Sequence, residues 1–162
     1  MKILGIDPGT ATVGWGMIEA INGKPRVVAY GHIATDKALP MEKRLQEIRS
    51  DLMVIIERYQ PERAAVEELF FFKNQKTIIT VAEARGVILL TLADFSLSIA
   101  EYTPLQVKQS LTNYGRAEKY QMQLMVQKLL GLSAIPKPDD AADALAIALC
   151  DLARYKMELI QN

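Results

Sequence analysis

Several acidic residues of this sequence stand directly after apolar segments, where a carboxylate can be held at the end of a strand. Asp7 ends the apolar segment 2–7 and is followed by Pro8-Gly9, a dipeptide that turns the chain. Glu67 ends the apolar segment 64–66. Taken singly, an ordinary turn aspartate and a solvated strand end explain these two positions at least as well as a catalytic role does.

A second acid, Glu68, follows Glu67 directly. Because side chains alternate between the two faces of a strand, only one of this pair can share a face with Asp7. The spacing alone leaves open which of the two it is.

Asp140 and Asp143 are three residues apart in a segment with helical character. This spacing places them on one helix face, roughly 5 to 6 Å apart at Cβ. Capping explains an aspartate in a first helical turn, but Asp143 lies a turn inside and precedes the apolar run 144–149. A carboxylate beside that surface is costly unless a positive group meets it, which favours a functional role.

Three or four carboxylates from two strand ends and one helix could bind two hard cations about 3.5 to 4 Å apart, the arrangement used in phosphoryl transfer. Oxygen ligands favour magnesium or manganese over zinc. His32 and Cys150 are the only residues of their types and lie in unrelated segments, which argues against a zinc site or a cysteine-histidine nucleophile. We interpret His32 as a strand residue and Cys150 as part of the core.

The elements that must position these acids follow from hydrophobic periodicity and turn residues. Asn22-Gly23 is a strong hairpin signal, so the first three strands should be antiparallel. Alternating helices and strands follow, which predicts an α/β fold with a mixed five-stranded sheet flanked by helices, in a single domain over residues 1–162. The expected strands are 2–7, 13–20, 26–34, 64–67 and 97–102, and the expected helices are 41–59, 75–94, 104–111, 117–130 and 138–156.

The overall charge is unlike that of a strongly basic nucleic-acid-binding protein, because 19 basic and 19 acidic residues give a net charge of zero. Residues 70–137 hold eight basic and four acidic residues, which leaves +4 there and −4 on the remainder. Cations bound by the acidic cluster would therefore give a positive working surface. The sequence shows no export signal or membrane-spanning segment, and one cysteine fits a reduced compartment, so we expect a soluble cytoplasmic protein.

Five short segments complete the pattern: Gly5-Ile6-Asp7-Pro8-Gly9-Thr10, Ala65-Val66-Glu67-Glu68-Leu69-Phe70, Gln106-Val107-Lys108-Gln109, Ala117-Glu118-Lys119 and Asp139-Asp140-Ala141-Ala142-Asp143-Ala144-Leu145-Ala146. In this order and spacing, the sequence resembles the RuvC family of bacterial Holliday-junction resolvases. The resemblance implies a ribonuclease H-like fold and a homodimer. It also implies paired symmetric nicking of four-way DNA junctions in recombination and repair, through two-metal hydrolysis that leaves a 5′ phosphate and a 3′ hydroxyl.

The same resemblance implies roles for individual residues. The catalytic, metal-binding carboxylates fall on Asp7, Glu67, Asp140 and Asp143, which selects Glu67 over Glu68 and Asp140 over Asp139; some members carry a histidine at the last position. They imply two Mg²⁺ ions per site, with Mn²⁺ as a substitute. Lys119 is expected in catalysis and DNA binding, Lys108 in phosphate binding, and Phe70 in stacking on a base. We also expect Lys73 to contact DNA.

The apolar helix expected near residues 75–92, interrupted by Gly86, is a candidate for the dimer interface, although it could equally be a buried helix of the monomer. A RuvA–RuvB branch-migration complex is the partner that the resemblance implies. Three alternatives remain at this stage. The segment Asp7-Pro8-Gly9-Thr10 also resembles a phosphate loop of actin-like or sugar-kinase ATPases, and the chain could be a junction-binding module without cleavage activity or a related nuclease acting on RNA.

Overall fold

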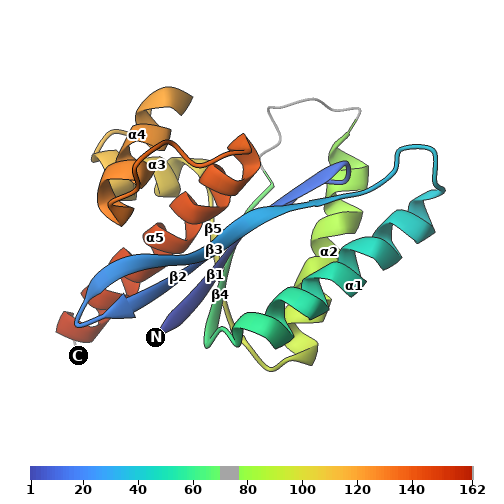
Figure 1. Ribbon diagram of the computed structural model, residues 1–162, viewed down its shortest axis with the longest axis horizontal. Coiled ribbons are helices and arrows are strands. Elements are labelled where there is room, and N and C mark those ends of the chain that lie inside the picture. The colour runs from blue at the N-terminus through green and yellow to red at the C-terminus, as the bar shows by residue number, and fades with distance from the viewer. Residues whose placement is uncertain (70–76, 162) are drawn as a thin grey trace.

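The computed structural model describes residues 1–69 and 77–161, and its centre is a five-stranded mixed sheet (Figure 1). The strand order is β3-β2-β1-β4-β5. Strand β2 pairs antiparallel with both β1 and β3, whereas β4 pairs parallel with β1 and β5 pairs parallel with β4. The predicted mixed sheet with three antiparallel strands first is confirmed. The strands are β1 (Lys2–Asp7), β2 (Thr12–Ile21), β3 (Lys24–Ala34), β4 (Arg63–Glu67) and β5 (Ser98–Tyr102).

The turn between β2 and β3 is the one that the sequence indicated. Asn22 and Gly23 both have positive φ, at 50° and 75°. Two such residues match a tight turn whose twist suits the two flanking strands, and asparagine and glycine tolerate this conformation best. The hairpin fixes the register of β2 against β3, and along its other edge β2 pairs Gly14 with Asp7 of β1.

Helices cover both faces of the sheet (Figure 1). α1 (Met41–Tyr59) and α2 (Ile78–Asp94) pack on one face, around a core that includes Leu4, Ile48 and Ile88. α5 (Asp139–Gln161) crosses the other face and is flanked by α3 (Pro104–Thr112) and α4 (Lys119–Leu130). Among the described residues, no helix combines the length and the apolar character needed to span a membrane.

The largest differences between predicted and observed helix ends are at the start of α4 and the end of α5. α4 was expected from residue 117 but begins at Lys119, because Glu118 caps it: its side chain and that of Gln121 exchange hydrogen bonds with the backbone of the first turn. α5 continues to residue 161 rather than ending at 156. The other described boundaries agree within two residues, and α1 matches residue for residue. The expected start of α2 at 75 lies outside the described residues.

Glycines allow α5 to lie directly against the sheet. Gly5, Gly14 and Gly16 sit on the strand face below this helix, with Gly5 paired to Gly16. A Cβ atom at Gly14 would lie 2.5 Å from the carbonyl carbon of Asp140, and one at Gly16 would lie 2.7 Å from Cγ of Leu145. Only residues without a side chain permit this close approach. The glycines therefore set how near the first turns of α5 come to β1 and β2.

Candidate active site

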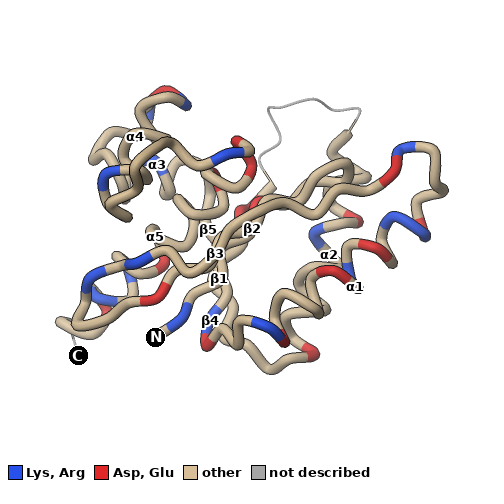
Figure 2. Tube along the Cα trace, viewed as in Figure 1, with Lys and Arg blue, Asp and Glu red and all other residues tan. Residues whose placement is uncertain are grey.

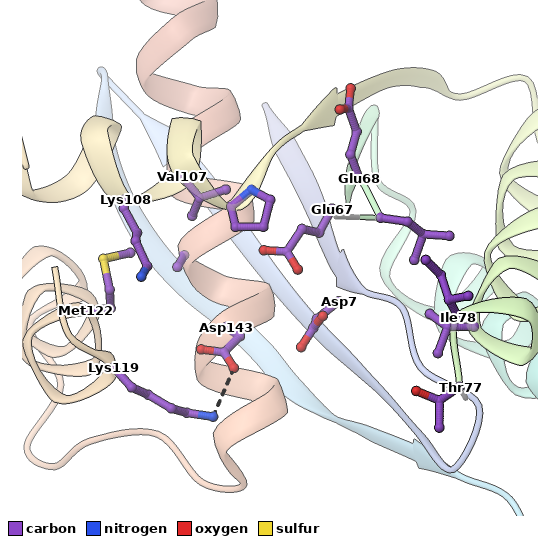
Figure 3. Close-up of a pocket in the computed structure, with 14 residues that line it drawn as sticks. Asp7, Glu67, Glu68, Thr77, Ile78, Val107, Lys108, Lys119, Met122 and Asp143 are labelled. Atoms are coloured by element: carbon purple, nitrogen blue, oxygen red, sulfur yellow. Dashed lines mark ion pairs between the residues drawn. The ribbon is translucent and has the colours of Figure 1, made fainter. Parts of the chain in front are cut away.

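The acidic residues of β1 and β4 meet at one end of the sheet. These strands are parallel neighbours in which Ile6 pairs with Val66, so Asp7 and Glu67, the next residues, leave the sheet side by side. Figure 3 shows the Glu67 side chain turned toward Asp7 and the Glu68 side chain turned away from Asp7, although both glutamates line the cleft. The alternation of side chains along β4 thus separates the two neighbouring glutamates, as the sequence required.

The first turns of α5 bring two more carboxylates to this end of the sheet. One carboxylate oxygen from each of Asp7, Asp140 and Asp143 lies within 4.8 Å of the others. Glu67 is not part of this tightest group, but it lines the same cleft as Asp7 and Asp143. The structure therefore gathers three of the four predicted carboxylates closely and places the fourth beside them.

The electrostatics of the cluster favour a bound cation. Burial raises the pKa of Asp7 well above its usual value, and the charges of Glu67, Asp143 and Asp140 raise it further. Burial is also the main cause of the raised pKa of Asp143, although the nearby Lys119 ammonium opposes it. Ionised carboxylates held this close repel one another, and a divalent cation between them would remove that repulsion.

Lys119, the first residue of α4, reaches over the acidic cluster from the side. Its Nζ lies 3.3 Å from Oδ2 of Asp143 and 3.4 Å from Oδ2 of Asp139 (Figure 3 marks the first contact). Partial burial acts to lower the pKa of Lys119, but the charges of Asp143 and Asp139 and their hydrogen bonds outweigh it and raise this pKa. Lys119 therefore stays positively charged beside the carboxylates.

Asp139 has a role that the sequence did not reveal. Besides its contact with Lys119, it accepts a hydrogen bond from Lys137 at 2.9 Å. The hydrogen bond from Lys137, followed by the charge of Lys119, lowers the pKa of Asp139. The preference of helix amino termini for acids accounts for an aspartate at this position without any ion pair. The contact with Lys119 depends on the placement of α4 beside α5, so the local pattern gives no signal for it.

The cleft above the carboxylates has a volume of about 590 Å³. Lys108 and Lys119 line it together with Val107 and Met122, and Ile78 and Val81 of α2 contribute apolar atoms. Leu69, the last described residue before the gap, also lines it. Phe70 and Lys73, the other two predicted DNA contacts, lie outside the described residues.

Basic and acidic residues are mixed over the rest of the molecule. Figure 2 shows lysines and arginines spread over many elements and interspersed with acids. His32 lies on the exposed side of β3 and Cys150 is buried in α5, as we expected from the sequence. Neither belongs to the acidic group, whose donors are all carboxylates. This donor set suits a hard divalent cation such as Mg²⁺ and fits the metal that the sequence implied.

A mixed sheet in this strand order, with carboxylates gathered from the ends of β1 and β4 and from a helix across the sheet, defines a ribonuclease H-like nuclease that uses divalent metal. The family model described as "Crossover junction endodeoxyribonuclease RuvC" matches residues 3–151. The chain belongs to the RuvC family. This assignment excludes the actin-like or sugar-kinase alternative.

Individual relatives resemble the chain over nearly its whole length. The crossover junction endodeoxyribonuclease RuvC of Caldicellulosiruptor saccharolyticus is 56% identical and covers 100% of this chain and 98% of its own. The solved structure of Thermus thermophilus RuvC has a TM-score of 0.91 at 34% identity, covering 98% of this chain and 97% of that one. T. thermophilus RuvC in complex with a Holliday junction substrate has a TM-score of 0.88 at 32% identity, with coverage of 97% and 96%.

Proposed function

We propose that this protein cuts four-way DNA junctions by paired symmetric nicks, hydrolysing one phosphodiester bond in each of two strands and leaving a 5′ phosphate and a 3′ hydroxyl. The observation that carries the proposal is the convergence of Asp7, Asp140 and Asp143 within 4.8 Å, in a chain of the RuvC family. The T. thermophilus relative solved with a Holliday junction substrate supports the choice of DNA.

The four carboxylates would hold the metals. Asp7 lies centrally, with Asp140 and Asp143 approaching from α5 and Glu67 from β4. These carboxylates would hold two Mg²⁺ ions, for which Mn²⁺ would substitute, and the chemistry that the metals would supply is activation of water and neutralisation of negative charge on the departing 3′ oxygen. The raised pKa values of Asp7 and Asp143 support this assignment, because burial leaves their ionised forms poorly stabilised until a cation neutralises them.

Two lysines of the cleft would act on the phosphate. Lys119 is charged and borders Asp143, so it can neutralise charge that develops on a phosphoryl oxygen beside the carboxylates. Lys108 lines the same cleft from α3 and is suited to holding a neighbouring phosphate of the backbone. For Phe70 and Lys73 we keep the DNA-binding roles inferred from the sequence. Phe70 would stack on a base, and Lys73 would contact the DNA backbone.

A homodimer would supply two such sites, related by a twofold axis that matches the symmetry of a four-way junction. We place α2 in the interface. Ile79 and Leu90 of this helix are 69% and 59% exposed, although Ile88 is fully buried, so α2 is only partly covered by its own chain. Gly86 leaves open space beside the helix backbone. We further propose cytoplasmic action with a RuvA–RuvB complex that delivers the junction.

The experiment that tests this function is cleavage of an end-labelled immobile four-way junction. A matched linear duplex and an RNA hairpin serve as competing substrates, and each reaction is run with Mg²⁺, with Ca²⁺ and with chelator. Symmetric nicks confined to the junction and dependent on Mg²⁺ are expected. Tight junction binding without cuts, over junctions of varied core sequence and with Mg²⁺ or Mn²⁺, would instead identify a binding module, and preferred cutting of the hairpin would identify an RNA nuclease.

A further inference from the structure

A buried ionic cluster ties α5 to β4 and β5 at a distance from the carboxylates. Nε of Arg63 donates to Oδ2 of Asp151 at 2.9 Å, and Nη2 donates to Oδ1 at 3.0 Å. The hydroxyl of Tyr102 donates to the same Oδ1 at 2.8 Å. Burial is the main cause of a raised pKa of Tyr102, so this hydroxyl keeps its proton. The ring of Tyr155 covers the guanidinium of Arg63, with 4.8 Å between Cζ and the ring centroid.

Each member of this cluster belongs to an element that carries or adjoins a proposed metal ligand. Arg63 begins β4, the strand that ends with Glu67. Tyr102 ends β5, pairs in register with Glu67, and accepts a hydrogen bond at its carbonyl from the amide of Glu68 at 2.8 Å. Asp151 lies eight residues beyond Asp143 on α5, about 12 Å along the helix axis.

The kind of contact matters as much as its place. Asp151 is fully buried, and the side chain of Arg63 is 19% exposed. A two-point contact between a guanidinium and a carboxylate fixes both the separation and the relative orientation of its partners. The apolar atoms under α5 attract without direction. The two-point contact therefore adds a directional restraint on rotation and axial movement of the helix.

We propose that Arg63, Tyr102 and Asp151 are positioning residues for the nuclease reaction. They set the rotation and axial position of α5 against β4 and β5, and so the distance from Glu67 to Asp140 and Asp143. This inference rests on the proposed function, because it takes those carboxylates as the metal site. It assigns a role in assembling that site to a cluster on the far part of the helix.

Tyr102→Phe is the sharpest test, because it removes one hydroxyl and keeps the ring in the core. Arg63→Lys is the second variant, since it keeps the charge and loses the two-point contact. The matched control is Arg49→Lys, which alters an ion pair of 3.0 Å with Asp94 that joins α1 to α2, two helices without metal ligands. Each protein is measured for melting temperature, junction affinity in Ca²⁺, single-turnover cleavage against Mg²⁺ concentration, and the rise in melting temperature caused by Mn²⁺ without DNA.

Misplacement of a reacting group by 1 Å costs about a hundredfold in rate, so the smaller displacement expected for Tyr102→Phe should slow single-turnover cleavage by about tenfold. We expect Arg63→Lys to show at least this loss. For both variants the Mg²⁺ requirement should rise, Mn²⁺ should stabilise less, and junction affinity should stay close to that of the unaltered protein. Arg49→Lys should leave cleavage and the Mn²⁺ effect unchanged.

A merely structural cluster gives a different pattern. If Tyr102→Phe melts at a lower temperature, yet below that temperature it cuts, responds to Mg²⁺ and is stabilised by Mn²⁺ as the unaltered protein is, the inference is overturned. Failure of Arg63→Lys to fold leaves this test intact, because it depends on Tyr102→Phe. If the unaltered protein does not cut junctions, the proposed function fails, while the Mn²⁺ comparison still decides whether the cluster positions a metal site.

Discussion

Gly14 offers a direct test of how closely the nuclease site depends on the position of α5 against the sheet. Gly14 pairs with Asp7 across the β1–β2 ladder, and the space that a side chain would take there is filled by the backbone of Asp140. The substitution Gly14→Ala places one methyl group against the backbone of Asp140, one of the proposed metal ligands. Nothing else in the site is changed, since alanine keeps a strand conformation.

The size of the effect follows from the geometry. The added Cβ would lie 2.5 Å from the carbonyl carbon of Asp140 and closer still to its carbonyl oxygen, whereas ordinary contact begins at 3.4 Å, so the two must separate by at least about 0.9 Å. If α5 takes up this movement, Asp140 and Asp143 leave Asp7 by a similar amount. A misplacement of this order costs about a hundredfold in rate, and overpacking costs about 1 to 3 kcal/mol in stability.

The assay is single-turnover cleavage of a four-way junction at saturating protein and Mg²⁺, together with junction affinity in Ca²⁺ and thermal melting. Ser98→Thr is the matched control, because it adds one methyl group to a strand at an exposed position of β5. We expect Gly14→Ala to bind the junction and to cut it about a hundredfold more slowly. A folded Gly14→Ala protein that cuts at the normal rate would refute the reasoning that the glycine sets the ligand distances.

Three further predictions concern the charges of the site. Asp7→Asn should abolish cleavage and leave junction affinity in Ca²⁺ nearly intact; a parallel loss of binding would contradict the assignment of Asp7 to metal. The pKa of Asp7 in the folded protein is raised above its value in the unfolded chain, which is about 4. The stability that Asp7 contributes to the metal-free protein is therefore fully present below about pH 4 and is lost as the pH rises through the folded-state pKa. In chelator, Asp7→Asn should therefore melt higher than the unaltered protein at pH 8 and no higher at pH 4, and an equal difference at both pH values would refute this. Lys119→Ala should slow single-turnover cleavage by about a hundredfold, and an unchanged rate at saturating protein would exclude a catalytic role.

Local signals in the sequence were sufficient for most of the fold. The helical spacing of apolar residues and the stop at Pro61 placed α1 at 41–59, and Asn22-Gly23 placed the first hairpin. The positions of Asp7 and Glu67 at strand ends follow from the same kind of pattern. Alternation along β4 required one glutamate to face Asp7, but choosing Glu67 over Glu68 needed the family resemblance.

Contacts between distant segments were not predictable in this way. Arg63 and Asp151 are 88 residues apart, and no local pattern around Asp151 indicates that its side chain is fully buried. Likewise, nothing in the sequence distinguished Gly14 from a glycine that merely weakens a strand, because its reason is the backbone of α5. The start of α4 was misjudged because capping by Glu118, rather than the helix preference of Ala117, fixes it.

The order of the elements also has a consequence for a chain that is still being made. Asp7 closes the first strand, whereas Asp140 and Asp143 open the last helix, so all five strands precede the second group of acids along the chain. A chain synthesised only as far as β5 therefore carries two of its four proposed metal ligands. The proposed metal site is complete only once α5 docks on the sheet.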